Sequence, residues 1–527
     1  MNENPGKEAE TGVGSTEVTT LNDMNQQDAD ALRQKLMAHV DNYATLGDHP
    51  IVKASNNAVQ GIGDIRESIG FFTPQLKILI EKKLDVLKEE VEARFDHLQA
   101  QGSESDERHA AGILLDATQK MLRLKNNKYL EVLQTSFFNN IFAIYDVFTG
   151  ELVKAIFIKK PSLFDAINKS LTFSEILKAG DIAAIKESVI DEEIDTIRRK
   201  SYVEQFEYFE NLFKIKLTAF ESWPRFVEAG QRRNLMTHCG GVVTEQYLAC
   251  CKKEKVKLPN DLKKGDKLKL STKYIVGTTD VVISVCVMLA QTLWRKVCPT
   301  VDEQEQAAKH LIKTTYDLLC AEQWVSAEMI GAYAMEIPVR KQMDTKSARM
   351  LAINRCIALR AMDKIPAMEP ILSSFDWSDA SLEFRLAEAV LRERYAEAGE
   401  LMLKIGKESE LVDRIGYIKW PLFRDFRATT DFAGAYKKLY GIDFLPGVKA
   451  EADQARAETV EVDTAEDVRS NSGSNLPVAA APAVSTEASG ARESDKAYVA
   501  LDVVPTGAPH AVSIVQMQKQ NEVRSLD

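Results

Sequence analysis

Residues 231–248 read Gln-Arg-Arg-Asn-Leu-Met-Thr-His-Cys-Gly-Gly-Val-Val-Thr-Glu-Gln-Tyr-Leu. They follow a segment, 202–220, whose apolar residues recur at helical spacing: Phe206, Phe209, Phe213 and Leu217. The pair Gly240-Gly241 predicts the end of a helix, because glycine readily adopts the left-handed conformation that terminates helices. The stretch therefore gathers two Arg, an Asn and a His at the C-terminal end of a predicted helix.

Helical periodicity extends outward in both directions from this stretch. An N-terminal helix is predicted to open at Thr73-Pro74, with one apolar stripe: Leu76, Ile80, Leu84, Leu87, Val91, Phe95 and Leu98. This stripe could face an intramolecular core or form a coiled coil in a dimer, and its length favours the core. A second apolar helix, over 130–148, is predicted to end at Thr149-Gly150. Because strand patterns are nearly absent, the sequence predicts an all-α fold.

Composition divides the chain into five parts. Residues 1–27 and 445–527 are polar and acidic, which predicts disordered tails, and residues 28–110 form an N-terminal helical segment. Residues 115–300 form a helical domain, and residues 301–441 read as α-hairpins that resemble a degenerate tetratricopeptide array. Three predicted joints share an x-x-Ala spacing: Trp324 to Ala327, Lys364 to Ala367 and Tyr395 to Ala398. Such hairpins commonly bind proteins, so a protein partner is predicted there.

Charge and cysteine usage favour a cytoplasmic protein. The net charge is −11, but residues 1–30 and 449–527 each contribute −6, which leaves the middle of the chain near neutrality at +1. The seven cysteines form no CxxC pair or metal-ligand cluster, so no metal site, no cofactor and free thiols are predicted. The longest apolar run, 281–290, is too short to span a bilayer. No nucleotide-binding loop, GxSxG or HExxH motif is present in the sequence.

Arg233, Asn234 and His238 are the candidate catalytic residues. Arg carries a permanent planar charge that fits a phosphate, and His exchanges protons near neutral pH. These groups suffice for a metal-free attack of a ribose 2′-OH on the adjacent phosphorus, with His238 as base or acid, Arg233 as phosphate clamp and Asn234 as a hydrogen-bonding partner. Residues five apart on a straight helix point about 140° apart. Arg233 and His238 would therefore contact the same substrate only if the helix departs from regular geometry near Gly240-Gly241, or if two subunits contribute residues to one site.

The Arg-Asn-x-x-x-His string at 233–238 resembles the motif of the HEPN superfamily (higher eukaryote and prokaryote nucleotide-binding). The predicted helix order over residues 115–300 is also similar to that of HEPN domains. The resemblance implies an all-α bundle, usually a homodimer, in which many members are metal-independent endoribonucleases of toxin–antitoxin, abortive-infection and anti-phage systems. It therefore predicts RNA as a partner and a prokaryotic defence or toxin role.

A lysine-rich segment follows the motif and is a candidate RNA-binding surface. Nine lysines lie between residues 252 and 273, among them Lys252, Lys253, Lys255 and Lys257, and Arg232 joins the predicted RNA contacts. Solvated loops are also rich in lysine, and no aromatic residues for base stacking are interleaved here.

Two other interpretations remain open. The cationic motif residues could interact only with the helix dipole and the last free carbonyl groups of the helix. The chain would then be a non-catalytic interaction protein that dimerises or binds nucleotides or proteins. The chain could also be a HEPN partner that is silenced by a nucleotidyltransferase antitoxin. Asp146, on the predicted helix over 130–148, could orient Arg233 or His238, although an exposed polar position is the simpler expectation.

Overall fold

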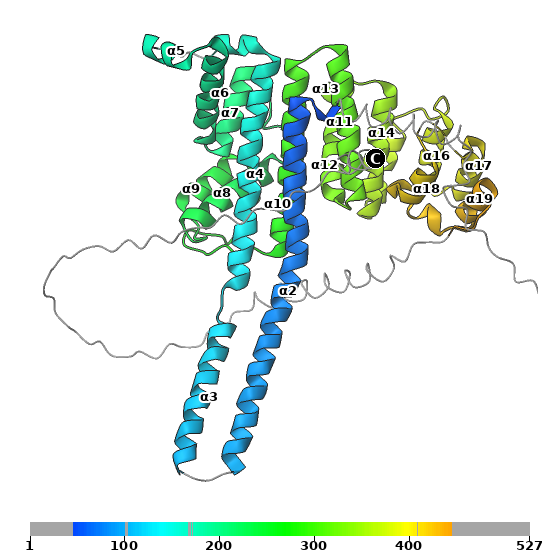
Figure 1. The fold of residues 1–527 in the computed structure, drawn as a ribbon. Helices are drawn as coiled ribbons and strands as arrows, with labels where there is room; N and C mark the ends of the chain where they lie inside the picture. Colours follow the sequence, from blue (N-terminus) through cyan, green and yellow to red (C-terminus); the bar gives the residue numbers. More distant parts are fainter. Residues whose placement is uncertain are drawn as a thin grey trace, which may run out of the picture. The chain divides into compact units, whose positions relative to one another are not determined.

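A computed structural model of the chain describes residues 46–444, apart from 101–103, 167–169, 171, 408 and 410. The described residues belong to one compact unit, and the predicted tails 1–27 and 445–527 lie outside them. Figure 1 shows an array of helices; among the described residues the only strand-like pairing is an isolated bridge between Val242 and Lys267. The prediction of an all-α fold is confirmed. The first half contains α2 (Pro50–Ala100), α3 (Glu104–Lys125), α4 (Tyr129–Lys159), α5 (Phe173–Ala179), α6 (Ile182–Arg198), α7 (Tyr202–Phe213), α8 (Trp223–His238), α9 (Glu245–Lys253) and α10 (Thr272–Val297).

Helix α10 is the centre of the bundle. It packs against α2, α4 and α8, and every residue of the apolar run Val281–Ala290 is buried. By length and composition α10 could cross a membrane, but 83% of its apolar window is covered by the surrounding helices. An apolar helix enclosed in this way is the core helix of a bundle.

Helix α4 does not end at Thr149-Gly150, as the sequence predicts, but continues to Lys159. Gly150 serves close packing instead: a Cβ atom there would collide with the guanidinium of Arg198 and come within 3.1 Å of Ile194 on α6. Burial of Leu152, Val153 and Ile156 beyond this point supplies the apolar contacts that continue the helix. The sequence alone therefore does not distinguish a glycine that allows two helices to pack closely from a glycine that ends a helix.

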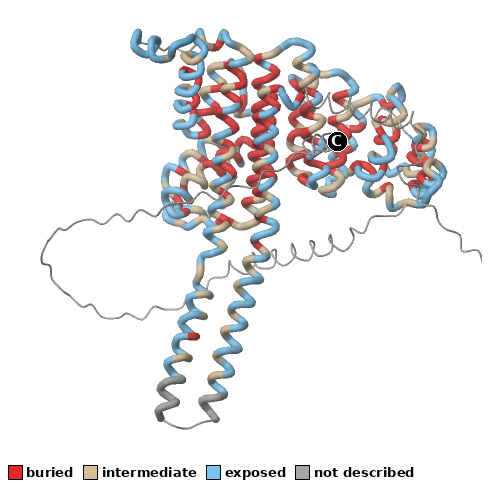
Figure 2. The backbone as a smooth tube through the Cα atoms, viewed as in Figure 1, coloured by how far each residue is buried: buried red, intermediate tan, exposed pale blue. Residues whose placement is uncertain are grey.

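Helix α2 likewise passes through the predicted start at Thr73-Pro74. The first part of α2 contacts α4 and α10 of the bundle, and its last part continues alongside α3 as a two-helix arm (Figures 1 and 2). Of the predicted apolar stripe, Leu76 to Val91 are half-buried, Phe95 is 51% exposed, and the burial of Leu98 lies outside what the structure describes. The α2 and α3 helices contact each other within the chain. Of the two alternatives for this stripe, the intramolecular contact is the one observed.

The second half of the chain consists of short antiparallel helices. They are α11 (Val301–Cys320), α12 (Trp324–Met335), α13 (Ile337–Arg340), α14 (Thr345–Ala361), α15 (Glu369–Leu372), α16 (Leu382–Leu391), α17 (Tyr395–Ile405), α18 (Arg414–Lys419) and α19 (Thr430–Tyr440). Helices α11 and α12 also contact α10, and one hydrophobic core runs through both halves. The parts predicted as 28–110, 115–300 and 301–441 therefore share a core over their described residues.

The three predicted hairpin joints have the same turn. Each contains a left-handed non-glycine residue, Glu322, Asp363 or Glu393, with φ of 57°, 57° and 59°. The amide of the next residue donates to the carbonyl five positions earlier in each turn, over 2.8–2.9 Å. Trp324, Ile365 and Tyr395 each lie two residues after the left-handed residue of their turn, so these three positions are structurally equivalent. The sequence alignment, which used Lys364, is therefore wrong by one position.

Candidate functional site

Helix α8 presents the motif residues and ends where the sequence predicts. Gly240 and Gly241 have φ of 59° and 81°, and the Gly241 amide donates to the Leu235 carbonyl over 3.0 Å. A Cβ atom at Gly241 would lie 2.9 Å from the Leu268 carbonyl oxygen, so this turn requires glycine for space as well as for conformation. Backbone hydrogen bonds then join residues 241–243 to 265–268.

The exposed side of the last two turns of α8 carries all three candidate catalytic residues. With Arg233 at 0°, Thr237, Asn234 and His238 follow at about 40°, 100° and 140° around the helix axis. Thr237 and His238 are exposed, Arg233 and Asn234 are half-buried, and Leu235 is buried on the opposite side. The helix stays regular through His238, so it does not relax as one prediction required. The arc from Arg233 to His238 therefore carries two half-buried side chains, Arg233 and Asn234, and two exposed ones, Thr237 and His238.

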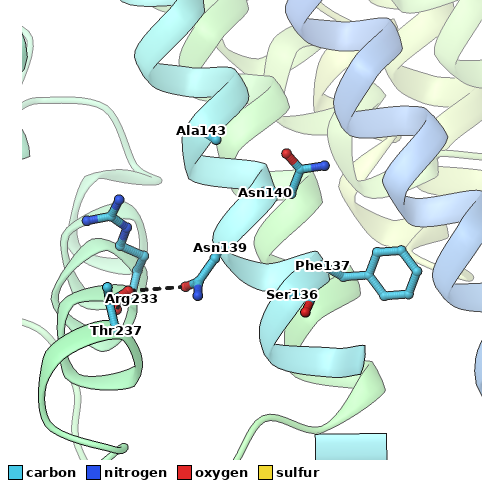
Figure 3. A pocket seen from close by; sticks show the side chains of 7 residues that line it. All are labelled: Ser136, Phe137, Asn139, Asn140, Ala143, Arg233 and Thr237. Carbon is cyan, nitrogen blue, oxygen red and sulfur yellow. Dashed lines mark hydrogen bonds between the residues drawn. The ribbon is translucent and has the colours of Figure 1, made fainter. Parts of the chain in front are cut away.

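Arg233 lines an open groove between α8 and α4 (Figure 3). The groove has a volume of about 590 Å³, and its other lining residues are Ser136, Phe137, Asn139, Asn140, Ala143 and Thr237. The Thr237 hydroxyl donates to Asn139 Oδ1 over 3.4 Å and to the Arg233 carbonyl over 2.9 Å. His238 is not part of the groove wall. The structure therefore brings Arg233 together with α4 residues and leaves His238 beside the groove, at the end of α8.

The Arg233 guanidinium is only partly engaged. Its Nη1 donates to Asn234 Oδ1 over 3.3 Å, while its buried Nε has no hydrogen-bond partner. A buried guanidinium nitrogen without a partner costs free energy, and Arg233 also lines the open groove, so its positive charge is suited to bind an anionic ligand there.

Asp146 on α4 is half-buried, and its carboxyl is close enough to Arg233 for the two charges to interact. Burial raises the pKa of the Asp146 carboxyl above its usual value, while the nearby Arg233 and a hydrogen bond from the Tyr202 hydroxyl oppose that shift. Tyr202 fits here because Gly230 has no side chain: a Cβ atom at that position would lie 2.6 Å from the ring. Asp146 is therefore half-buried and not the exposed polar position that is the simpler expectation, and the motif residue whose charge acts on it is Arg233.

Arg232 points away from the groove into a buried cluster. Glu228, 8% exposed, accepts hydrogen bonds from Arg232 Nε over 2.8 Å, Tyr247 Oη over 2.8 Å and Tyr274 Oη over 2.6 Å. The Arg232 guanidinium also lies 4.0 Å from the centroid of the Tyr274 ring. Burial and the Glu228 charge raise the pKa of Tyr274, which keeps its hydroxyl a donor. The predicted RNA contact from Arg232 would have to break this cluster, which ties α8 to α9 and α10.

The four predicted RNA-binding lysines are all exposed, on α9 and the loop after it. Their neighbours in sequence face inward: Cys251 belongs to a small core with Leu235, and Val256 packs against it. Lys253 lies 3.5 Å from Glu207 and 3.7 Å from Glu254. The segment that carries the lysines therefore packs on the same small hydrophobic core as the end of α8.

Sequence reasoning missed the parts of this region that depend on tertiary contacts. The spacing of four between Glu228 and Arg232 could have indicated their ion pair. No sequence signal places Tyr202 behind Arg233 or Asn139 across the groove from Thr237. Among the described residues, no group of three or more His, Cys, Asp or Glu side chains is arranged to hold a metal ion, and the seven cysteines are free thiols. Family models, curated proteins and solved structures were compared with the chain, and none matched it.

Proposed function

We propose that this chain is a metal-independent endoribonuclease that acts at the exposed end of α8. The observation that carries the proposal is the position of Arg233, whose buried Nε lacks a partner at an open groove beside His238. A guanidinium in this state favours a phosphate, and the neighbouring imidazole is exposed enough to reach a ribose.

In the proposed reaction an RNA strand crosses the arc from Arg233 to His238. His238 takes the proton of a ribose 2′-OH while that oxygen attacks the adjacent phosphorus, and the bond to the 5′-oxygen breaks. The protonated imidazole returns its proton to the leaving 5′-oxygen, which gives a 2′,3′-cyclic phosphate and a 5′-hydroxyl end. Arg233 stabilises the negative charge on the phosphoryl oxygens, and Asp146 keeps the guanidinium oriented.

The test is incubation of purified protein with total RNA in EDTA, followed by end-group analysis of the fragments. Wild type is expected to leave 2′,3′-cyclic phosphate ends, and His238→Ala and Arg233→Ala to lose at least about 100-fold in rate. Arg225→Ala, an exposed arginine earlier on α8, is the matched control and should keep full activity. Cleavage that persists in His238→Ala would refute the proposal.

Whether one chain suffices is tested by mixing the two inactive variants. If each chain uses its own Arg233 and His238, the mixture stays inactive; if two chains pool residues, mixed dimers regain activity. The position of both residues on one helix supports the first outcome. RNA binding without cleavage by the folded wild type would instead favour the non-catalytic interaction protein.

The exposed lysines are proposed to guide RNA toward the arc. The triple variant Lys252→Gln, Lys255→Gln and Lys257→Gln should weaken RNA binding and reduce the slope of log K against log salt by about 2, since each phosphate contact on a single strand contributes roughly 0.7. An equal slope in wild type and variant would show that these lysines do not contact the RNA phosphates.

A defence or toxin role is proposed as the biological setting. Expression in a bacterial host is expected to arrest growth, and His238→Ala to abolish the arrest. If a neighbouring gene product restores growth without affecting expression, the interpretation of an antitoxin-silenced partner is favoured.

A further inference from the structure

The arm formed by α2 and α3 has a second apolar stripe that no described part of the chain covers. Phe72, Leu79, Val86 and Ala93 recur every seven residues along α2 and are exposed, with Phe72 and Leu79 at 49% and Val86 at 63%. This stripe is distinct from the half-buried one. Figure 2 shows the exposed character of both helices of the arm. A seam between two packed helices has two apolar positions in each seven residues, and this stripe supplies one of them.

Charges beside the stripe are segregated along the helix. Lys82 and Lys83 stand three and four residues after Leu79, whereas Glu89 and Glu90 occupy the same two positions after Val86. All four side chains are exposed. The four charges three and four residues after Leu79 and Val86 are therefore basic nearer the bundle and acidic nearer the tip of the arm. Over residues 79–86 as a whole, Glu81 and Asp85 balance the two lysines. Glu90 also lies 3.1 Å from Arg94.

We propose that this face of α2 binds the same face of a second copy of the chain, antiparallel, with Val86 on the two-fold axis. Leu79 and Ala93 are equally far from Val86, so the larger side chain of each copy meets the smaller one of its partner. Lys82 and Lys83 then lie opposite the partner's Glu90 and Glu89. A parallel pair would instead place lysines beside lysines and glutamates beside glutamates, so charge complementarity selects the antiparallel arrangement.

The pairing is independent of the nuclease proposal, and its test has no catalytic readout. Sedimentation of the full chain at micromolar concentration is expected to give a dimer. Reversal of the two lysine charges by Lys82→Glu and Lys83→Glu should raise the dimer Kd at least about tenfold, because opposite charges in each contact become like charges. Adding Glu89→Lys and Glu90→Lys in the same chain should restore the Kd to within about threefold. A monomeric wild type, or a dimer unaffected by the first pair of substitutions, would overturn the proposal.

Cysteine cross-linking distinguishes the two orientations. Under mild oxidation Val86→Cys should form a disulfide-linked dimer, and Leu79→Cys should do so only when mixed with Ala93→Cys. Ile78→Cys, exposed elsewhere on the same turn of α2, and the wild type with its exposed Cys239 and Cys320 are the controls. A disulfide formed by Leu79→Cys alone would overturn the antiparallel arrangement. Because these positions are exposed, circular dichroism is expected to show native helix content in each variant.

Discussion

Removal of the Glu228 carboxylate is expected to destabilise the region that carries the candidate site. Glu228 accepts three hydrogen bonds, over 2.8, 2.8 and 2.6 Å, from Arg232, Tyr247 and Tyr274. The Glu228→Ala substitution leaves the buried hydroxyl of Tyr247, the partly buried hydroxyl of Tyr274 and a guanidinium that is only 15% exposed without their shared acceptor. Breaking a buried ion pair by removing one partner costs about 3–5 kcal/mol of unfolding free energy.

Calorimetry or circular dichroism of the full chain measures this effect as a change in Tm. With an unfolding entropy of about 2.1 cal/mol/K per residue over the roughly 400 residues that the structure describes, the expected decrease is about 4–6 °C. Glu245→Ala removes a carboxylate of α9 that is 73% exposed, and should change Tm by less than about 1 °C. The pair Glu228→Gln and Arg232→Met removes both charges and should recover part of the loss. A Glu228→Ala protein that melts with the wild type would refute the assigned role of the cluster.

Three further predictions concern Gly230, His310 and Glu322. Gly230→Ala should lower the unfolding free energy by about 1–3 kcal/mol, measured by thermal melting, because its Cβ would lie 2.6 Å from the Tyr202 ring; an unchanged Tm would show that the ring can move. Burial lowers the pKa of His310 to about 3, so between pH 6.5 and pH 5 only the unfolded chain binds a proton at this residue. The unfolding free energy measured by thermal melting should therefore be about 2 kcal/mol lower at pH 5 than at pH 7. The His310→Gln variant should show a weaker dependence of stability on pH. Glu322→Gly should raise the unfolding free energy by about 1 kcal/mol, since Glu322 has a left-handed backbone. Glu305→Gly, inside α11, should lower the unfolding free energy by a similar amount. If both substitutions change the unfolding free energy in the same direction, the backbone of Glu322 is not strained.

Much of the local structure can be predicted from the sequence. Apolar spacing identifies the helices, and Gly240-Gly241 ends α8 as predicted because a left-handed turn has few alternatives to glycine. The order Arg233, Asn234, Thr237, His238 along one helix also fixes their angular positions around its axis. These features depend on neighbouring residues alone.

Other features were decided only by packing between distant segments. Helices α4 and α2 continue through Gly150 and Pro74, because buried contacts on the far side of each position support further turns. Arg232 and Arg233 are adjacent in sequence and equally basic, yet one is held by Glu228 and the other opens onto the groove.

The sequence by itself determined the helical class, the end of α8 and the arc of the motif, since a helix sets these by its own periodicity. Only the tertiary structure showed that the residues from Leu76 to Val91 are half-buried while Phe72, Leu79, Val86 and Ala93 remain exposed, because burial depends on the helices that pack against α2. The partner surface of a side chain is a property of distant residues, and local periodicity does not encode it.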